Sequence, residues 1–166
     1  MPKREKQRSA KEQEKKEGIV QAVIRVAAIA AALAATFPFL QTNRLFVGPV
    51  VIVLGLVALG MIKFAGRRLH TVTADIVYGA IDGGILAIIT SLSALYGGVI
   101  GAIFGGILGD AVTDSIAGIF EGHIALWLRK HGVKESRTPL SSSLGKMSGV
   151  LIAAGIIISF IWAALP

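Results

Sequence analysis

Cysteine is absent from this 166-residue chain, and charged residues make up only 16% of it. The lack of cysteine excludes a disulfide framework and any thiolate metal site. The scarcity of charge excludes an ordinary soluble domain, in which about a quarter of the residues are charged. What the chain has instead is apolar side chains, because 54% of its residues are hydrophobic and the mean hydropathy is +0.71. This composition is typical of a membrane protein.

The formal net charge of +7 does not indicate nucleic-acid binding, because the basic residues gather in the N-terminal tail and in short loops. Residues 1–18 form a basic tail, for which we expect a mobile segment or fraying helix on the membrane surface. The sequence ALAAT near Ala35 resembles a signal-peptide cleavage site, but the apolar run 19–40 is longer than the hydrophobic core of most signal peptides.

Residues 19–166 are predicted to form one all-α transmembrane domain. A helix needs about 20 apolar residues to cross the hydrocarbon layer. The turn-forming residues Pro38, Gly48-Pro49, Tyr96-Gly97-Gly98 and Thr138-Pro139 mark the expected ends of such segments. On this basis five spans are predicted, at about 20–40, 46–65, 72–95, 97–126 and 147–165.

The loops between these spans predict the orientation of the chain. If five helices alternate, loops 63–71 and 127–146 share one side with the basic tail, and the opposite side carries only Arg44. Positive loops face the cytosol, so we expect a multi-pass protein of the cell membrane with a cytoplasmic N-terminus and an outside C-terminus. Arg25 lies about one turn inside the first span, where its side chain can extend to the headgroups.

The fourth predicted span carries two different faces. Glycine recurs at every fourth position from Gly97 to Gly109, which places these residues within an arc of about 120° on one side of a helix. Glycine faces let membrane helices approach closely, so we interpret this face as a packing surface, self-association being one version of it. Acidic residues occupy nearly the opposite side, within about 40° of one another. They are Asp110, Asp114 and Glu121.

The third predicted span supplies further acids. Asp75 and Asp82 are seven residues apart and therefore share one helix face. With about 1.5 Å of rise per residue, Asp82 and Asp114 lie at similar depths, roughly 15 to 18 Å from the cytoplasmic end. If the two acid faces meet, they form a metal-binding cluster in the middle of the membrane with a vestibule at its cytoplasmic mouth. The cluster comprises Asp82, Asp110 and Asp114, and the vestibule comprises Asp75, Glu121 and His123.

Carboxylates packed together in a low dielectric cannot all stay ionised, so they hold protons or exchange them for a divalent cation. Oxygen ligands without thiolates favour ions such as Mg²⁺, Mn²⁺ or Fe²⁺.

Simpler interpretations remain open for each acid. Asp75 and Glu121 would pair with nearby arginines, Asp82 would mark a helix break at Gly83-Gly84, and Asp110 and Asp114 would cap a helix that breaks at Gly109. His123 would be a hydrogen-bonded interfacial residue.

The stretch ADIVYGAIDGGILAIITSLSAL resembles the first transmembrane helix of the vacuolar iron transporter family, whose pattern Asp75, Gly79, Asp82 and Gly83 match in spacing. GDAVTDSIAGIFEGHIA is similar to a diverged second helix of that family, with Asp110 at its acidic position, and RTPLSSSLGKMSGVLIAAG resembles the entry to its third helix. The resemblance implies a homodimeric exporter that exchanges cytosolic Fe²⁺ or Mn²⁺ for protons between the acidic helices of two subunits. Gly118 matches the position of a methionine that helps to bind iron in the family, and the family's glutamate-rich cytoplasmic helices are missing.

Two other functional classes compete with a proton-coupled cation transporter. In the first, the glycine face is the function and the chain is a packing or scaffold protein. In the second, paired membrane aspartates act as the acid and base of an intramembrane protease. That motif requires a glycine where Ile107 stands, so we predict no catalytic residues and no enzyme. The expected partners are the lipid bilayer, divalent cations, protons and a second copy of the chain.

Overall fold

The computed structural model describes the chain except for residues 1, 67–68, 70–71, 131–137 and 165–166, and the side chains of 2–17 and 120–129 are likewise outside the described part. Within these limits every regular element is helical, as predicted. The elements are α1 (Pro2–Thr42), a 3₁₀ helix η1 (Arg44–Phe46), α2 (Val47–Phe64), α3 (Thr73–Lys130) and α4 (Pro139–Ala164). By length and composition, four described segments can cross a membrane: Gly18–Thr42, Arg44–Phe64, Thr73–Ile119 and Pro139–Ala164.

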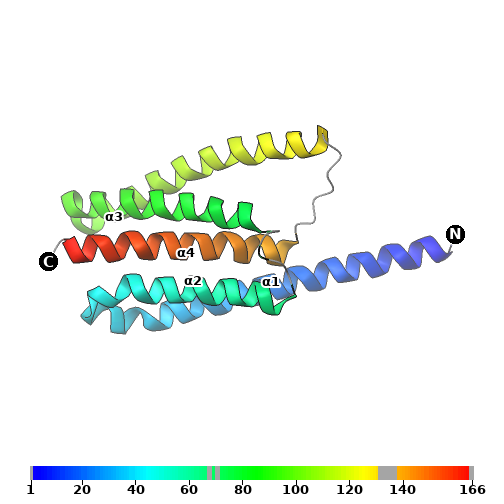
Figure 1. Ribbon diagram of the computed structural model, residues 1–166, viewed down its shortest axis with the longest axis horizontal. Coiled ribbons are helices and arrows are strands. Elements are labelled where there is room, and N and C mark those ends of the chain that lie inside the picture. Colours follow the sequence, from blue (N-terminus) through cyan, green and yellow to red (C-terminus); the bar gives the residue numbers. More distant parts are fainter. Residues whose placement is uncertain (1, 67–68, 70–71, 131–137, 165–166) are drawn as a thin grey trace.

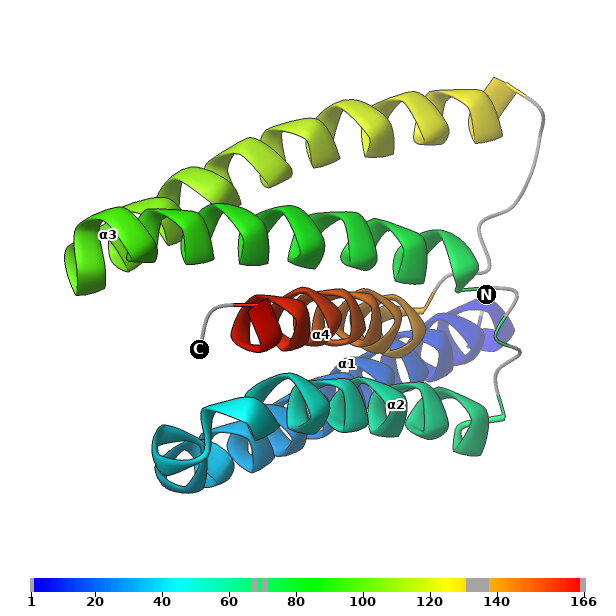
Figure 2. The same cartoon turned by 60° about the vertical axis from the view of Figure 1, so that its left-hand side comes forward.

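Helix α3 is a hairpin of two helical arms. Its backbone leaves helical geometry at Gly98, where φ is 56° and ψ is −137°, and the second arm then runs back along the first (Figures 1 and 2). A positive φ of this kind favours glycine, because any side chain would clash with the backbone. The turn predicted at Tyr96-Gly97-Gly98 is therefore present. We call residues 73–97 the first arm and residues 99–130 the second arm.

Helix α1 continues past Pro38 and ends at Thr42, two residues beyond the predicted end of the first span at about residue 40. Proline in a helix removes one backbone hydrogen bond. Pro38 lies close to the C-terminal end of α1, so the missing backbone hydrogen bond affects only the end of the helix.

Helix α4 begins at Pro139, eight residues before the predicted span. Thr138 precedes it as a capping residue, since its Oγ1 accepts a hydrogen bond from the Ser141 backbone N–H at 3.2 Å. In return, the Thr138 backbone N–H donates to Ser141 Oγ at 3.1 Å. This reciprocal pair has the geometry of a capping box, and proline is favoured at the first helical position. The segment that looked like a polar loop therefore starts the helix.

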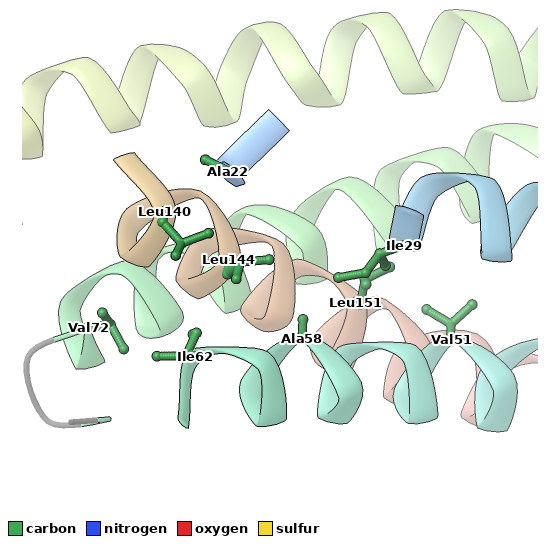
Figure 3. Close-up of a cluster of buried hydrophobic side chains, with 9 residues drawn as sticks. All are labelled: Ala22, Ile29, Val51, Ala58, Ile62, Val72, Leu140, Leu144 and Leu151. Atoms are coloured by element: carbon green, nitrogen blue, oxygen red, sulfur yellow. The ribbon is translucent and has the colours of Figure 1, made fainter. Parts of the chain in front are cut away.

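Helix α4 lies at the centre of the bundle and contacts α1, α2 and α3 (Figure 1). A cluster of buried aliphatic side chains joins α4 to its neighbours, with Leu144 and Ala58 completely buried (Figure 3). Many large apolar side chains on the outside of the bundle stay exposed, including Phe104 and Phe160, which is the arrangement expected of helices that face lipid. The buried cluster consists of Ala22, Ile29, Val51, Ala58, Ile62, Val72, Leu140, Leu144 and Leu151.

Pairs of glycines hold α4 against the first arm of α3. A Cβ atom on Gly149 would overlap the Ile76 carbonyl oxygen and lie 2.7 Å from the Ala80 nitrogen, and one on Gly83 would lie 2.6 Å from Val150 Cα. Gly79 is equally close to the Lys146 backbone. Two glycines four residues apart on the first arm thus face close backbone of α4, which is the small-residue packing common in membrane helices.

Arg25 has a protein partner in the structure. Its guanidinium donates a hydrogen bond to the Met61 carbonyl oxygen at 3.4 Å, in the last turn of α2. The last carbonyl groups of a helix carry partial negative charge, so a cation is favourable there. Arg25 thereby ties α1 to α2, and its extension to the headgroups stays a prediction.

Candidate functional site

The glycine face of the second arm packs against the first arm of the same chain. A Cβ atom on Gly105 would lie 2.5 Å from Ser93 Cβ, and one on Gly109 would lie 2.9 Å from Leu86 Cδ1. Gly101 meets the Ser93 backbone. The next residue at the same spacing, Thr113, is also buried, with 4% exposure. The predicted close packing is therefore present, and it takes place inside one chain.

Asp110 and Asp114 lie on the side of the second arm that faces away from the bundle, and both are exposed. Within the described residues neither carboxylate has a hydrogen bond or ion pair. Large apolar side chains of the same arm are also exposed, among them Ile107 at 67% and Ile119 at 73%. Two carboxylates thus sit on a surface whose composition otherwise suits lipid.

The backbone around the acids is continuous helix. Gly98 is the residue of α3 with non-helical dihedral angles, so the chain does not break at Gly109 or at Gly83-Gly84. The interpretations of Asp110 and Asp114 as caps, and of Asp82 as a marker of a break, are therefore wrong. Inside a continuous helix the backbone N–H groups are already bonded, and a carboxylate has none to cap.

Asp82 lines a crevice between the two arms of α3. The crevice has a volume of about 490 Å³, and its walls include Val77, Ile81 and Ile85 from the first arm and Ile116 from the second. The Asp82 Oδ1 atom is buried and has no hydrogen-bond partner in the described part of the chain. A buried carboxylate oxygen without a donor is costly, so it marks a place where a proton or cation is favourable.

Asp75 occupies a different environment although it shares a helix face with Asp82. It is 2% exposed, and its Oδ1 accepts a hydrogen bond from Ser142 Oγ of α4 at 3.1 Å. A Cβ atom on Gly145 would lie 3.0 Å from Asp75 Cβ. Helix α4 therefore covers Asp75, whereas its neighbours Thr73 and Ala74 line the crevice. The arginines considered as its partners, Arg67, Arg68 and Arg129, lie outside the described residues.

The four predicted site residues with described side chains are not assembled within one chain. Asp82 faces the crevice, Asp75 faces α4, and Asp110 and Asp114 face outward on the other side of the second arm. The side chains of Glu121 and His123 lie outside the described part of α3. Among the described side chains there is no group of three or more acids or histidines able to hold a metal ion.

Several polar residues near these acids were not singled out by the sequence. Ser142 bonds Asp75, and Lys146 places its Nζ atom 4.9 Å from the centre of the Tyr78 ring. Thr113 donates a hydrogen bond to the Asp110 carbonyl oxygen at 3.2 Å. The one available signal was the four-residue spacing that continues the glycine face to Thr113.

No model of a known protein family matches the chain, and neither a curated protein nor a solved structure does. The described fold and site define an all-helical protein with several helices apolar enough for a membrane, which indicates a membrane protein. Its distinguishing feature is the α3 hairpin, which carries Asp82 in the crevice between its arms and Asp110 and Asp114 on the outward side of its second arm.

Proposed function

We propose that the protein is a divalent cation transporter of the cell membrane, working as a homodimer and exchanging Fe²⁺ or Mn²⁺ for protons along Asp82, Asp110 and Asp114. The observation that carries the proposal is the exposure of Asp110 and Asp114 on an otherwise apolar helix face. A charged side chain in the middle of a bilayer costs about 2.5 to 3.5 kcal/mol by the lower estimates. Two such groups need a partner, a proton or a cation.

A second copy of the chain supplies such a partner. In a two-fold dimer the same surface of both subunits meets, so two acid faces bring two pairs of carboxylates together. Ionised carboxylates at such close range repel, and a divalent cation between them offsets this repulsion. Protons replace the cation when it leaves, which couples the two fluxes.

Asp82, on the first arm, extends the path into the crevice between the two arms, where one of its carboxylate oxygens lacks a hydrogen bond among the described residues. The spacing of Asp75, Gly79, Asp82 and Gly83 that resembles the vacuolar iron transporters supports the same class of function.

The membrane topology proposed with this function has five spans. Each arm of the α3 hairpin is long enough to cross the hydrocarbon layer, since about 20 residues suffice, and the turn at Gly98 separates them. The basic tail and loops then lie on the cytoplasmic side, and the C-terminus lies outside.

The competing classes have less support. The glycine face is already covered by Ser93 and Leu86 of the same chain, so the scaffold interpretation lacks its exposed glycine surface. An aspartyl protease needs two carboxyl groups that share a proton. Within one chain, Asp82 of the first arm lies in the crevice between the arms, whereas Asp110 faces outward from the second arm.

Crystals soaked with Mn²⁺ test the binding step. We expect an anomalous-scattering peak beside the carboxylates of Asp110 and Asp114, between the two copies. Ordered Mn²⁺ elsewhere, with no density beside Asp82, Asp110 or Asp114, would contradict the site.

The homodimer is tested by cysteine crosslinking, for which the cysteine-free chain is well suited. Ala111→Cys places a thiol at an exposed position directly after Asp110, and mild oxidation in membranes is expected to give a crosslinked dimer. Val53→Cys, on the exposed side of α2 at 57% exposure, is the matched control and should stay monomeric on a denaturing gel. Equal crosslinking of the two variants would argue against an interface on the acid face.

A further inference from the structure

The crevice between the arms of α3 has the properties of a small-molecule site. Its volume of about 490 Å³ lies within the range of about 300 to 1,000 Å³ that is usual for ligand pockets. The walls are aliphatic, from Val77, Ile81, Ile85 and Ile116, and Tyr78 adds an aromatic ring. Such pockets usually combine apolar walls with a few polar groups that orient the ligand.

Asp82 is the acid that the crevice offers to a ligand. Its Oδ1 atom is buried without a hydrogen-bond partner among the described residues. Thr73 and Tyr78 are further polar residues of the lining, and Thr113, on the second arm, already donates its hydroxyl to the Asp110 carbonyl oxygen. The carboxylate therefore lacks a compensating positive charge or donor from this neighbour, and a bound cation would provide one.

We propose that this crevice binds a lipophilic organic cation, with the positive charge of the ligand beside Asp82 and its apolar body against the aliphatic walls. A divalent metal fits the crevice of a single chain poorly, because Mg²⁺ and similar ions require about six oxygen ligands. The described residues hold no group of three acids or histidines. A monovalent cation with an apolar body matches one carboxylate and an apolar cavity in both charge and surface.

This site shares Asp82 with the proposed metal path, but its other residues differ from those of the path. The crevice lies between the two arms, whereas Asp110 and Asp114 lie on the outward side of the second arm. Binding in the crevice requires neither a second copy nor a metal ion.

Tetraphenylphosphonium is a suitable probe, and tetraphenylborate is an anion of nearly the same size and shape. With purified protein in lipid nanodiscs, equilibrium dialysis is expected to show saturable binding of the phosphonium and no saturable binding of the borate. Asp82→Asn should weaken phosphonium binding about tenfold or more, because about 1.4 kcal/mol of lost charge attraction corresponds to a factor of ten. Saturable binding of both ions, unaffected by Asp82→Asn, would indicate an apolar slot for lipid chains and overturn the proposal.

A steric pair of variants locates the site. Ile116→Trp fills the crevice and is expected to abolish binding, whereas Ile119→Trp adds the same bulk at a position that is 73% exposed and should bind the probe normally. Phosphonium binding that survives Ile116→Trp unchanged would exclude the crevice.

Asp114→Asn separates the two proposals, since it should lower Mn²⁺ flux and leave phosphonium binding intact. Phosphonium binding without Mn²⁺ flux rejects the metal transporter alone. Mn²⁺ flux without phosphonium binding rejects the crevice site alone.

Discussion

Gly149→Ala is expected to destabilise the protein by about 3 kcal/mol, the upper end for overpacked sites. The added Cβ atom would overlap the Ile76 carbonyl oxygen and lie 2.7 Å from the Ala80 nitrogen and 3.0 Å from the Gly79 carbonyl carbon. These are backbone atoms of a regular helix, so no flexible side chain can move aside. Helix α4 would have to shift away from the first arm of α3, and thermal unfolding of the purified protein in detergent measures the loss.

Gly84→Ala is the matched control for this interface. A Cβ atom at Gly84 would lie 3.8 Å from Ala153 Cβ, which is ordinary van der Waals contact, and alanine is favoured over glycine in a helix by about 1 kcal/mol. This variant should keep or raise the unfolding temperature. If the two alanine variants unfold at the same temperature, the glycine contact between α3 and α4 is not as close as described.

Asp82→Asn and Asp110→Asn are each expected to lower divalent cation flux in proteoliposomes at least about tenfold. Each change removes one negative charge from the path, and in a low-dielectric site such a loss readily exceeds the 1.4 kcal/mol that corresponds to a tenfold change. Asparagine keeps the shape of the side chain. Because Asp82 Oδ1 makes no hydrogen bond with the described residues, we expect Asp82→Asn to unfold at the same temperature as the wild type or above it.

Ser115→Ala provides the control on the same arm. Ser115 is an exposed residue next to Asp114, and its hydroxyl donates to the Ala111 carbonyl oxygen within the helix at 2.7 Å. Its replacement should leave flux unchanged. Wild-type flux in both aspartate variants would remove Asp82 and Asp110 from the transport path.

The helical class and the approximate positions of the long helices follow from composition and apolar run length, because both depend on local sequence. The hairpin turn was predictable for the same reason, since Gly97-Gly98 interrupts an apolar run. The start of α4 was missed because a run of serines looks like a loop. Its capping role depends on the bonds between Thr138 and Ser141.

The faces of the second arm were predictable, but their neighbours were not. Helical periodicity places glycines and acids on opposite sides of one helix. It cannot tell which side meets the first arm, and the structure shows that the glycines do. A pairing of acid faces within the chain would have been incompatible with this packing, because an arm can present only one side to its neighbour.

Asp75 illustrates a second limit of periodicity. It shares a helix face with Asp82, yet α4 covers the one and the crevice between the arms receives the other. The close contacts of Gly79 and Gly83 with α4 decide this arrangement, and their partners are some 65 to 70 residues away in the sequence.

The central claim, that the protein moves divalent cations across a membrane, is tested most directly by Mn²⁺ uptake into proteoliposomes loaded with a metal-sensitive dye. The account predicts saturable Mn²⁺ entry that exceeds entry into protein-free liposomes and is accompanied by counterflow of protons. Entry at the protein-free rate for Mn²⁺, Fe²⁺ and Mg²⁺ alike, with folded protein present in the vesicles, would contradict it.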